Sequence, residues 1–100
     1  MSNEKMNFFL KLNPPRPSFV ADMLDEERAT MEQHVNYWIP YVNDGTAIVL
    51  GPVLDPNGAY GVAVVAVDSE EQLHRIIARD PANGLNSYEI FPMKAMTAAR

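Results

Sequence analysis

Few polar residues in this sequence have the type and position that chemistry requires. His34 lies beside a predicted apolar stripe, three residues after Met31 and four before Trp38, so a helix would place it at the edge of a buried face. An imidazole that is partly withdrawn from water can still exchange protons near neutral pH. A lone histidine that only packs in the structure, or lies exposed, is the more common alternative.

His74 and Asp80 are weaker candidates when each is taken alone. His74 has Glu71 and Arg75 close by in the sequence, which is typical of a solvated helix face. Asp80 occupies the C-terminal turn of a predicted helix, just before Pro81. An acidic group there is unfavourable to the helix dipole, an anomaly that a functional role would explain.

Other classes of site are not supported by the sequence. The two histidines are forty residues apart without a carboxylate at ligand spacing, so no metal site is indicated. The chain has no cysteine, which removes disulfides, thiolate metal sites and cysteine nucleophiles. No serine sits on a nucleophile-elbow pattern, and the glycines do not form a phosphate-binding loop. We therefore expect neither a metal nor an organic cofactor.

Composition limits the kind of protein further. The 100 residues suit a single domain, 1–100, and an apolar share of 47% is enough for a core. With 8 basic and 13 acidic residues the net charge is −5, which disfavours nucleic acid or a membrane surface as partner. No apolar run approaches the ~20 residues of a membrane span, and the polar start lacks a signal peptide. We expect a cytoplasmic protein with flexible ends at 1–5 and 95–100.

The elements that must position these residues follow the order βαββαβ. The predicted strands cover residues 6–12, 46–53, 60–67 and 88–93, and the predicted helices cover 26–43 and the segment from 69 to the stop at 80–81. Residues 55–58, Asp-Pro-Asn-Gly, have strong turn chemistry and make strands two and three a hairpin. This order is that of an α+β, ferredoxin-like fold, an antiparallel sheet with both helices on one face.

The first helix carries three specific expectations. Asp25 is expected to be its N-cap, and Pro40 is expected to kink its last turn or end it early. Its core-facing stripe, at helical spacing, is predicted to be Met31, Val35, Trp38 and Val42. The preceding run of residues 14–17, Pro-Pro-Arg-Pro, is predicted to be a stiff loop, with a polyproline ligand as the less frequent alternative.

Strands two and three are apolar on both faces, although two helices can cover only one face. Strict alternation would place Ala47, Val49 and Gly51 on one face, with Ile48, Leu50 and Pro52 on the other. The uncovered patch would be large for a monomer. We therefore expect a homodimer through the sheet faces, with further assembly left open. The alternative is a monomer whose second face is covered by the proline-rich loop and the tail.

The order and spacing of several short motifs resemble the YCII-related domain family. These motifs are Arg16-Pro17, Asp25-Glu26-Glu27, His34 followed by Tyr37-Trp38, Gly51-Pro52 and Asp80-Pro81. The resemblance covers most of the chain, from about Phe8 to Pro92, whereas the 14–17 loop and Pro40 depart from the family pattern. It implies a dimeric α+β barrel, related in architecture to muconolactone isomerases and cofactor-independent monooxygenases.

The resemblance also implies an active site with a histidine–aspartate pair, at the matching positions His34 and Asp80. A carboxylate that accepts from one imidazole nitrogen fixes the tautomer and leaves the other nitrogen free as a base. Such a pair suits elimination, isomerisation or hydrolysis of a small activated substrate, including aromatic-derived compounds. The other expected site residues are Arg16 for a substrate anion, Tyr37 and Trp38 as apolar walls, and Gly51 and Pro52 close to His34.

Two functions of different class remain open at this stage. One is a cofactor-independent lyase, isomerase or hydrolase acting through His34 and Asp80. The other is a non-catalytic small-ligand-binding or assembly module, in which the pair is only a structural hydrogen bond. The two helices are expected to run in nearly the same direction. Contact between the two residues would then require the loop after the second helix to fold back toward the sheet.

Overall fold

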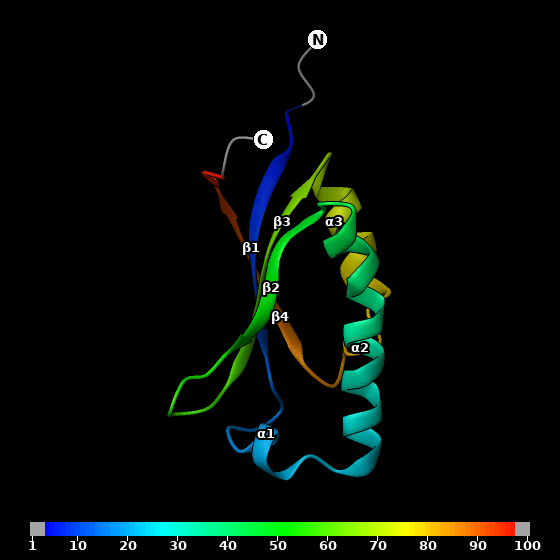
Figure 1. The fold of residues 1–100 in the computed structure, drawn as a ribbon, viewed down its shortest axis with the longest axis vertical. Helices are drawn as coiled ribbons and strands as arrows, with labels where there is room; N and C mark the ends of the chain where they lie inside the picture. The colour runs from blue at the N-terminus through cyan, green and yellow to red at the C-terminus, as the bar shows by residue number, and fades with distance from the viewer. Residues whose placement is uncertain (1–3, 98–100) are drawn as a thin grey trace.

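The chain folds into a four-stranded sheet covered by helices (Figure 1), and a computed structural model describes residues 4–97. The elements are β1 Met6–Asn13, α1 Phe19–Asp22, α2 Asp25–Asn43, β2 Ala47–Val53, β3 Tyr60–Val67, α3 Glu70–Ala78 and β4 Ser87–Met93. All six predicted elements are confirmed, and their predicted first and last residues agree with the structure to within one residue. For the second predicted helix this holds for its start, since only a stop signal was predicted for its end. The short helix α1, inside the loop after β1, was not predicted.

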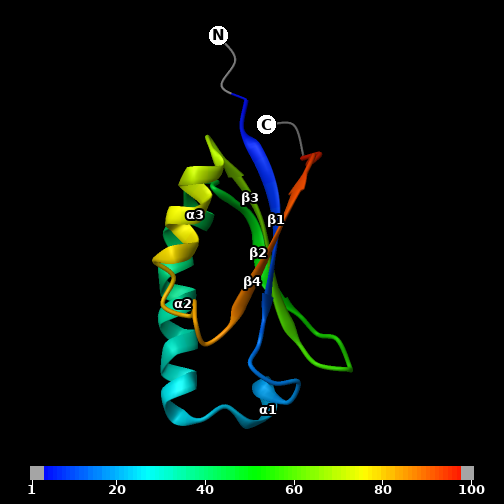
Figure 2. The ribbon, with the colours of Figure 1, turned by 180° about the vertical axis from the view of Figure 1, so that it is seen from behind.

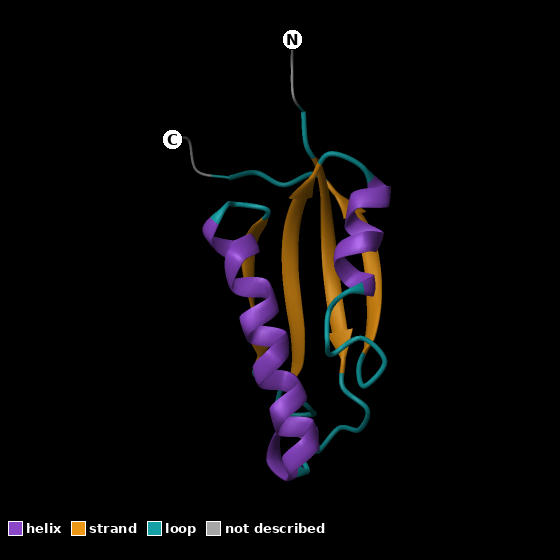
Figure 3. Ribbon diagram, turned by 90° about the vertical axis from the view of Figure 1, so that its right-hand side faces the viewer, coloured by secondary structure: helices purple, strands orange, loops and turns teal. Residues whose placement is uncertain are grey.

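The sheet has the strand order β2-β3-β1-β4, and every neighbouring pair is antiparallel. Both long helices pack on one face of this sheet (Figure 3), and the view from behind in Figure 2 shows them on that same side. This arrangement confirms the predicted ferredoxin-like α+β fold. Among residues 4–97, no helix combines the length and the apolar character that crossing a bilayer requires.

The expected direction of the helices is wrong. Because β1 and β2 both pair antiparallel with β3, β1 and β2 are parallel to each other, and β3 and β4 run the opposite way. The crossover through α2 therefore returns the chain in the opposite sense to the crossover through α3. Figure 1 shows this: α2 climbs from cyan to green while α3 descends from olive to gold.

The core lies between the helices and the inner face of the sheet. In β1 the predicted alternation is confirmed, because Phe8, Leu10 and Leu12 are buried while the residues between them are only half-buried. In β3 the buried set is likewise every second residue. The predicted apolar face of α3 is also buried and joins the same cluster; it consists of Leu73, Ile76 and Ile77.

Strand β2 departs from strict alternation, so the predicted division of its residues is wrong. The register shifts between Ala47, which pairs with Val65, and Val49, which pairs with Val64. This bulge accommodates Ile48 as an extra residue, so Ala47 faces the helices whereas Val49 lies on the outer face.

Helix α2 differs from expectation at both ends. Its N-cap is Leu24 rather than Asp25, because the Leu24 amide donates to the Glu27 carboxylate at 2.9 Å and Asp25 already belongs to the helix. Pro40 does not end the helix, which continues through it to Asn43. Pro40 lies in the last turn, where its missing amide removes only one hydrogen bond.

The buried stripe of α2 also differs from the predicted one. His34 and Trp38 are buried, with Met31 and Tyr41 partly buried, whereas Val35 and Val42 are about half exposed. The helix is therefore rotated relative to the expected stripe, with its polar-tipped aromatic and imidazole side chains inward. As a result His34 lies within the buried face instead of at its edge.

The outer face of the sheet has no helix over it, and its residues follow from the strand register. Phe9 pairs with Phe91, their ring centroids 6.0 Å apart, and Val64 pairs with Val49. Val49 and Phe91 are each about half exposed. The outer face therefore carries apolar side chains from all four strands, with the cross-strand pair Lys11 and Glu89 beside them.

Candidate functional site

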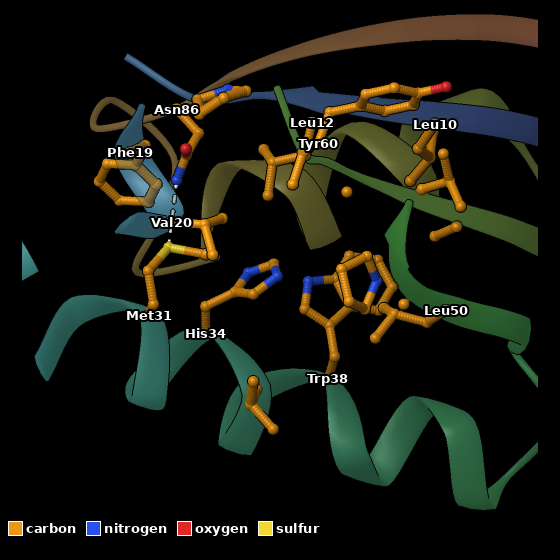
Figure 4. Close-up of a pocket in the computed structure, with 18 of the residues that line it drawn as sticks. Leu10, Leu12, Phe19, Val20, Met31, His34, Trp38, Leu50, Tyr60 and Asn86 are labelled. Atoms are coloured by element: carbon orange, nitrogen blue, oxygen red, sulfur yellow. Dashed lines mark hydrogen bonds between the residues drawn. The ribbon is translucent and has the colours of Figure 1, made fainter. Parts of the chain in front are cut away.

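A cavity of about 320 Å³ lies between α2 and the inner face of the sheet (Figure 4). Helix α1 contributes Phe19 and Val20 to its wall, and Phe19 is buried. The loop before α1 also touches the β2–β3 turn, where Gly58 has a φ of +139° and a side chain would come within 3.1 Å of the Pro17 carbonyl. The unpredicted α1 segment thus closes part of the cavity wall.

Asp80 is the centre of the polar cluster next to this cavity. Its carboxylate is only 3% exposed and accepts hydrogen bonds from His34 Nδ1 at 2.8 Å, Trp38 Nε1 at 2.9 Å and the Ala82 amide at 2.9 Å. The Tyr88 hydroxyl donates a fourth. Among the described residues, no buried side-chain nitrogen or oxygen atom lacks a partner. The predicted contact between His34 and Asp80 is therefore present, and it is part of a larger network.

Hydrogen bonding keeps the Asp80 carboxyl ionised. Burial by itself would raise the pKa of Asp80, but donation from His34, Tyr88, Trp38 and the Ala82 amide outweighs burial and holds that pKa below its ordinary value. An ionised carboxylate only accepts hydrogen bonds, so the neutral His34 ring carries its proton on Nδ1. Its Nε2 then keeps a lone pair, and His34 is one of the residues that line the cavity.

The opposite directions of the helices bring these two residues together. Helix α3 has nine residues and α2 has nineteen. With a rise of about 1.5 Å per residue, an antiparallel α3 that starts near the end of α2 finishes about halfway along it. His34 occupies that halfway position, and Asp80 follows two residues after the end of α3. The Tyr37 hydroxyl, which donates to the Ile76 carbonyl at 2.7 Å, holds the same two helices together.

Four of the predicted site residues line one cavity, and Asp80 lies next to it without lining it. His34 and Trp38 enter it from α2, and Gly51 and Pro52 enter it from the end of β2. Figure 4 shows His34 and Trp38 side by side on one wall. Gly51 and Pro52 therefore share a cavity with His34, while their role in binding stays a prediction.

Arg16 and Tyr37 are not among the described residues that line the cavity. The Arg16 guanidinium binds the Glu27 carboxylate at 2.8 and 3.0 Å and the Asp22 carboxylate at 2.8 Å. Donation from Arg16 and from the Leu24 amide lowers the pKa of Glu27 to about 2. Arg16 thus ties α1 to the start of α2, and its predicted role in holding a substrate anion finds no support.

Sequence reasoning missed Tyr88 and Asn86 and gave Trp38 only an apolar role. Tyr88 pairs with Leu12 across the sheet and shares its inward face, and it lines the cavity together with the buried Asn86. A signal was available for Tyr88, because alternation in β4 places it on the same face as Ile90. The partner of the Trp38 Nε1–H could not be found this way, since it comes from a distant loop.

His74 is exposed and pairs with Glu70 across one helical turn at 3.4 Å, as its predicted solvated position implies. Within residues 4–97 no group of three or more histidine, cysteine, aspartate or glutamate side chains could hold a metal ion.

In Asp80→Asn, the free energy of unfolding is expected to depend less on pH below about pH 6 than in the wild type. The pKa of Asp80 is lower in the folded protein than in the unfolded chain, so its ionisation stabilises the fold above the unfolded pKa of about 3.9. That stabilisation is lost as the pH falls through the lower folded value. Urea midpoints measured between about pH 6 and pH 2 should therefore fall less in the variant than in the wild type. The exposed Asp68→Asn is the control, and equal slopes for Asp80→Asn and wild type would contradict the prediction.

The sequence model of the YCII-related domain family matches residues 7–97, most of the chain. No curated protein matches the chain at a significant level.

Proposed function

This chain belongs to the YCII-related domain family, and from that premise we propose that it is a small-molecule enzyme using His34 and Asp80 for general acid–base chemistry. One observation carries the proposal: the Nδ1 of His34 is bound to the buried Asp80 carboxylate, which leaves Nε2 as the free nitrogen of a residue that lines an apolar cavity. A buried, oriented imidazole beside a ligand-sized cavity is the usual form of a general base.

In the proposed reaction, Nε2 of His34 removes a proton from a substrate in the cavity and later returns it. Asp80 holds the ring in the required tautomer and stabilises the imidazolium that forms. Trp38 and Tyr88 donate to the same carboxylate and so keep it in place.

The same base fits three reactions of a small activated compound. In isomerisation the proton returns at another atom of the substrate, and in elimination it goes to the group that leaves as the double bond forms. In hydrolysis the base takes the proton from a water molecule that attacks the substrate, and passes it to the leaving group.

Gly51 and Pro52 are proposed to complete the binding surface opposite α2. Pro52 shares the inward face of β2 with Leu50 and so presents its ring to the cavity, whereas Gly51 contributes only backbone to this wall. Trp38 supplies the flat apolar wall next to His34.

His34→Ala is expected to lower turnover at least about a hundredfold, the lower end of what general acid–base catalysis contributes. Turnover should be measured on the compounds that wild type converts in a screen of small lactones, enolisable ketones and β-substituted carbonyl compounds. His74→Ala is the matched control and should leave turnover unchanged, because His74 is exposed on the outer side of α3. Unchanged turnover in His34→Ala would overturn the role of His34, and a wild type that converts none of the screened compounds would favour the alternative, a non-catalytic ligand-binding or assembly module.

We also propose that the protein acts as a homodimer whose outer sheet faces pack together. Supporting this is the apolar surface of the outer face, where Phe9, Val49, Val64 and Phe91 come from all four strands. Such a patch is large for an isolated subunit, and a second copy of the same face is self-complementary under twofold symmetry.

A further inference from the structure

The walls of the cavity are built from apolar side chains. Strands, the loop before α2 and both helices α1 and α2 contribute to it, and the residues that matter here are Leu10, Phe19, Met23, Met31, Val35 and Leu50. Its volume of about 320 Å³ lies at the small end of the ~300–1,000 Å³ that ligand pockets span. The ligand that fills it is therefore compact, about the size of one or two rings.

No fixed positive charge among the described residues faces this cavity, because neither lysine nor arginine is among those that line it. Lys11 lies over the Tyr60 ring, 4.6 Å from its centroid, but belongs to the outward-facing set of β1. Arg16 already donates to two carboxylates and to the Asp22 carbonyl, at 2.8–3.0 Å. A carboxylate or phosphate ester in the cavity would lose its water without gaining a permanently charged partner, which is costly.

A cation would find no carboxylate among the described residues of the wall. Asp80 is not a lining residue, and its two oxygens already accept four hydrogen bonds from within the protein. The polar side chains that remain at the wall belong to His34, Tyr60, Tyr88 and Asn86, and none of them is a carboxylate. Of these, Tyr88 is already committed to Asp80, and Asn86 Nδ2 contacts the Met31 sulfur at 3.3 Å.

We propose that the cavity selects uncharged, compact, mainly apolar molecules that carry a single polar group toward His34, and that it rejects anions and cations of the same size. The inference rests on the proposed function, because it takes the cavity as the substrate site, and it names the substrate class. The mainly apolar walls favour an apolar ligand, and the imidazole of His34 favours one polar group on that ligand.

Trp38 reports on the cavity directly, because it is the only tryptophan of the chain and lines the wall next to His34. Its fluorescence should be titrated with three ring compounds of equal size: cyclohexanol, cyclohexanecarboxylate and cyclohexylammonium. Cyclohexanol is expected to bind at least about tenfold more tightly than either ion. Equal or tighter binding of an ion, or no response to cyclohexanol, would overturn the proposal.

A designed reversal tests the physical cause. Val35 lines the cavity but is 50% exposed, so Val35→Lys can be accommodated with its stem along the wall and its ammonium group at the rim. This variant should raise the affinity for cyclohexanecarboxylate about tenfold relative to the affinity for cyclohexanol. Val42→Lys, on the same helix but outside the cavity and 44% exposed, is the control and should change neither. Carboxylate binding that rises equally in both variants would overturn the proposal.

The two proposals fail in different ways. Selective binding of cyclohexanol without turnover of any screened compound supports the neutral-ligand preference and counts against the enzyme. His34-dependent turnover of a carboxylate compound, in preference to its neutral analogue, supports the enzyme and overturns the neutral-ligand preference.

Discussion

Asp80→Ala is expected to lower the free energy of unfolding by about 3–5 kcal/mol, since removing one partner of a buried charged network leaves the others unpaired. The donors left behind would be His34 Nδ1, Trp38 Nε1, the Tyr88 hydroxyl and the Ala82 amide, which surround a residue that is itself buried. The loss also removes the contacts that connect α2, β4 and the loop after α3.

Urea unfolding of Asp80→Ala and wild type, at one fixed protein concentration, measures this loss. Asp68→Ala is the matched control, because Asp68 is also a paired aspartate but forms one exposed contact with Lys5. Its urea midpoint should barely move. If Asp80→Ala were destabilised by less than about 1 kcal/mol, the Asp80 network would not be the structural centre that its contacts suggest.

Val64→Asp is expected to give a folded monomer, whereas Val65→Asp should not fold. The two residues are neighbours in β3 but face opposite ways: Val65 is completely buried under the helices, and Val64 pairs with Val49 on the outer face. An unpaired carboxylate at Val65 would be enclosed in the core, which is prohibitively costly. At Val64 the same charge stays in water in one subunit but would be buried in the proposed dimer.

Sedimentation and circular dichroism together separate these outcomes. Wild type should sediment as a dimer at micromolar concentration, Val64→Asp as a monomer with native secondary structure, and Val65→Asp should lack that structure. A wild-type protein that sediments as a stable, well-folded monomer would contradict the homodimer. A dimeric Val64→Asp would show that subunits associate through some other surface.

The regular parts of the fold were predictable because they repeat. Period-two and helical spacing located the strands and both long helices, and turn residues located the hairpin. The irregular parts each depend on single residues: the bulge at Ile48 reverses the face of part of β2, and the rotation of α2 exchanges Val35 for His34 in the buried stripe. Hydrophobicity alone favours valine over histidine inside, and only the partner Asp80 makes the buried imidazole acceptable.

The candidate site was predictable in its main pair but not in its geometry. His34 and Asp80 came from the family resemblance, and the expected helix directions would have kept them apart unless a loop folded back. The antiparallel course of the helices removes that difficulty. The partners of Arg16 could not be predicted, because Asp22 belongs to helix α1. The prolines just before this helix favour a loop, so the helix itself was not predicted.

The length of α3 has a consequence for how sequences of this kind can change over time. Each residue inserted into or deleted from a helix turns everything after it by about 100° and moves it by about 1.5 Å. A single insertion between Glu70 and Ala78 would therefore swing Asp80 away from His34, while the apolar face of the helix would also lose its register with the sheet. Loops such as that of residues 54–59, at the far end of the hairpin, are free of this coupling. Insertions and deletions should therefore occur mainly in such loops. The length of α3, nine residues, should stay constant in sequences that retain the pair of His34 and Asp80.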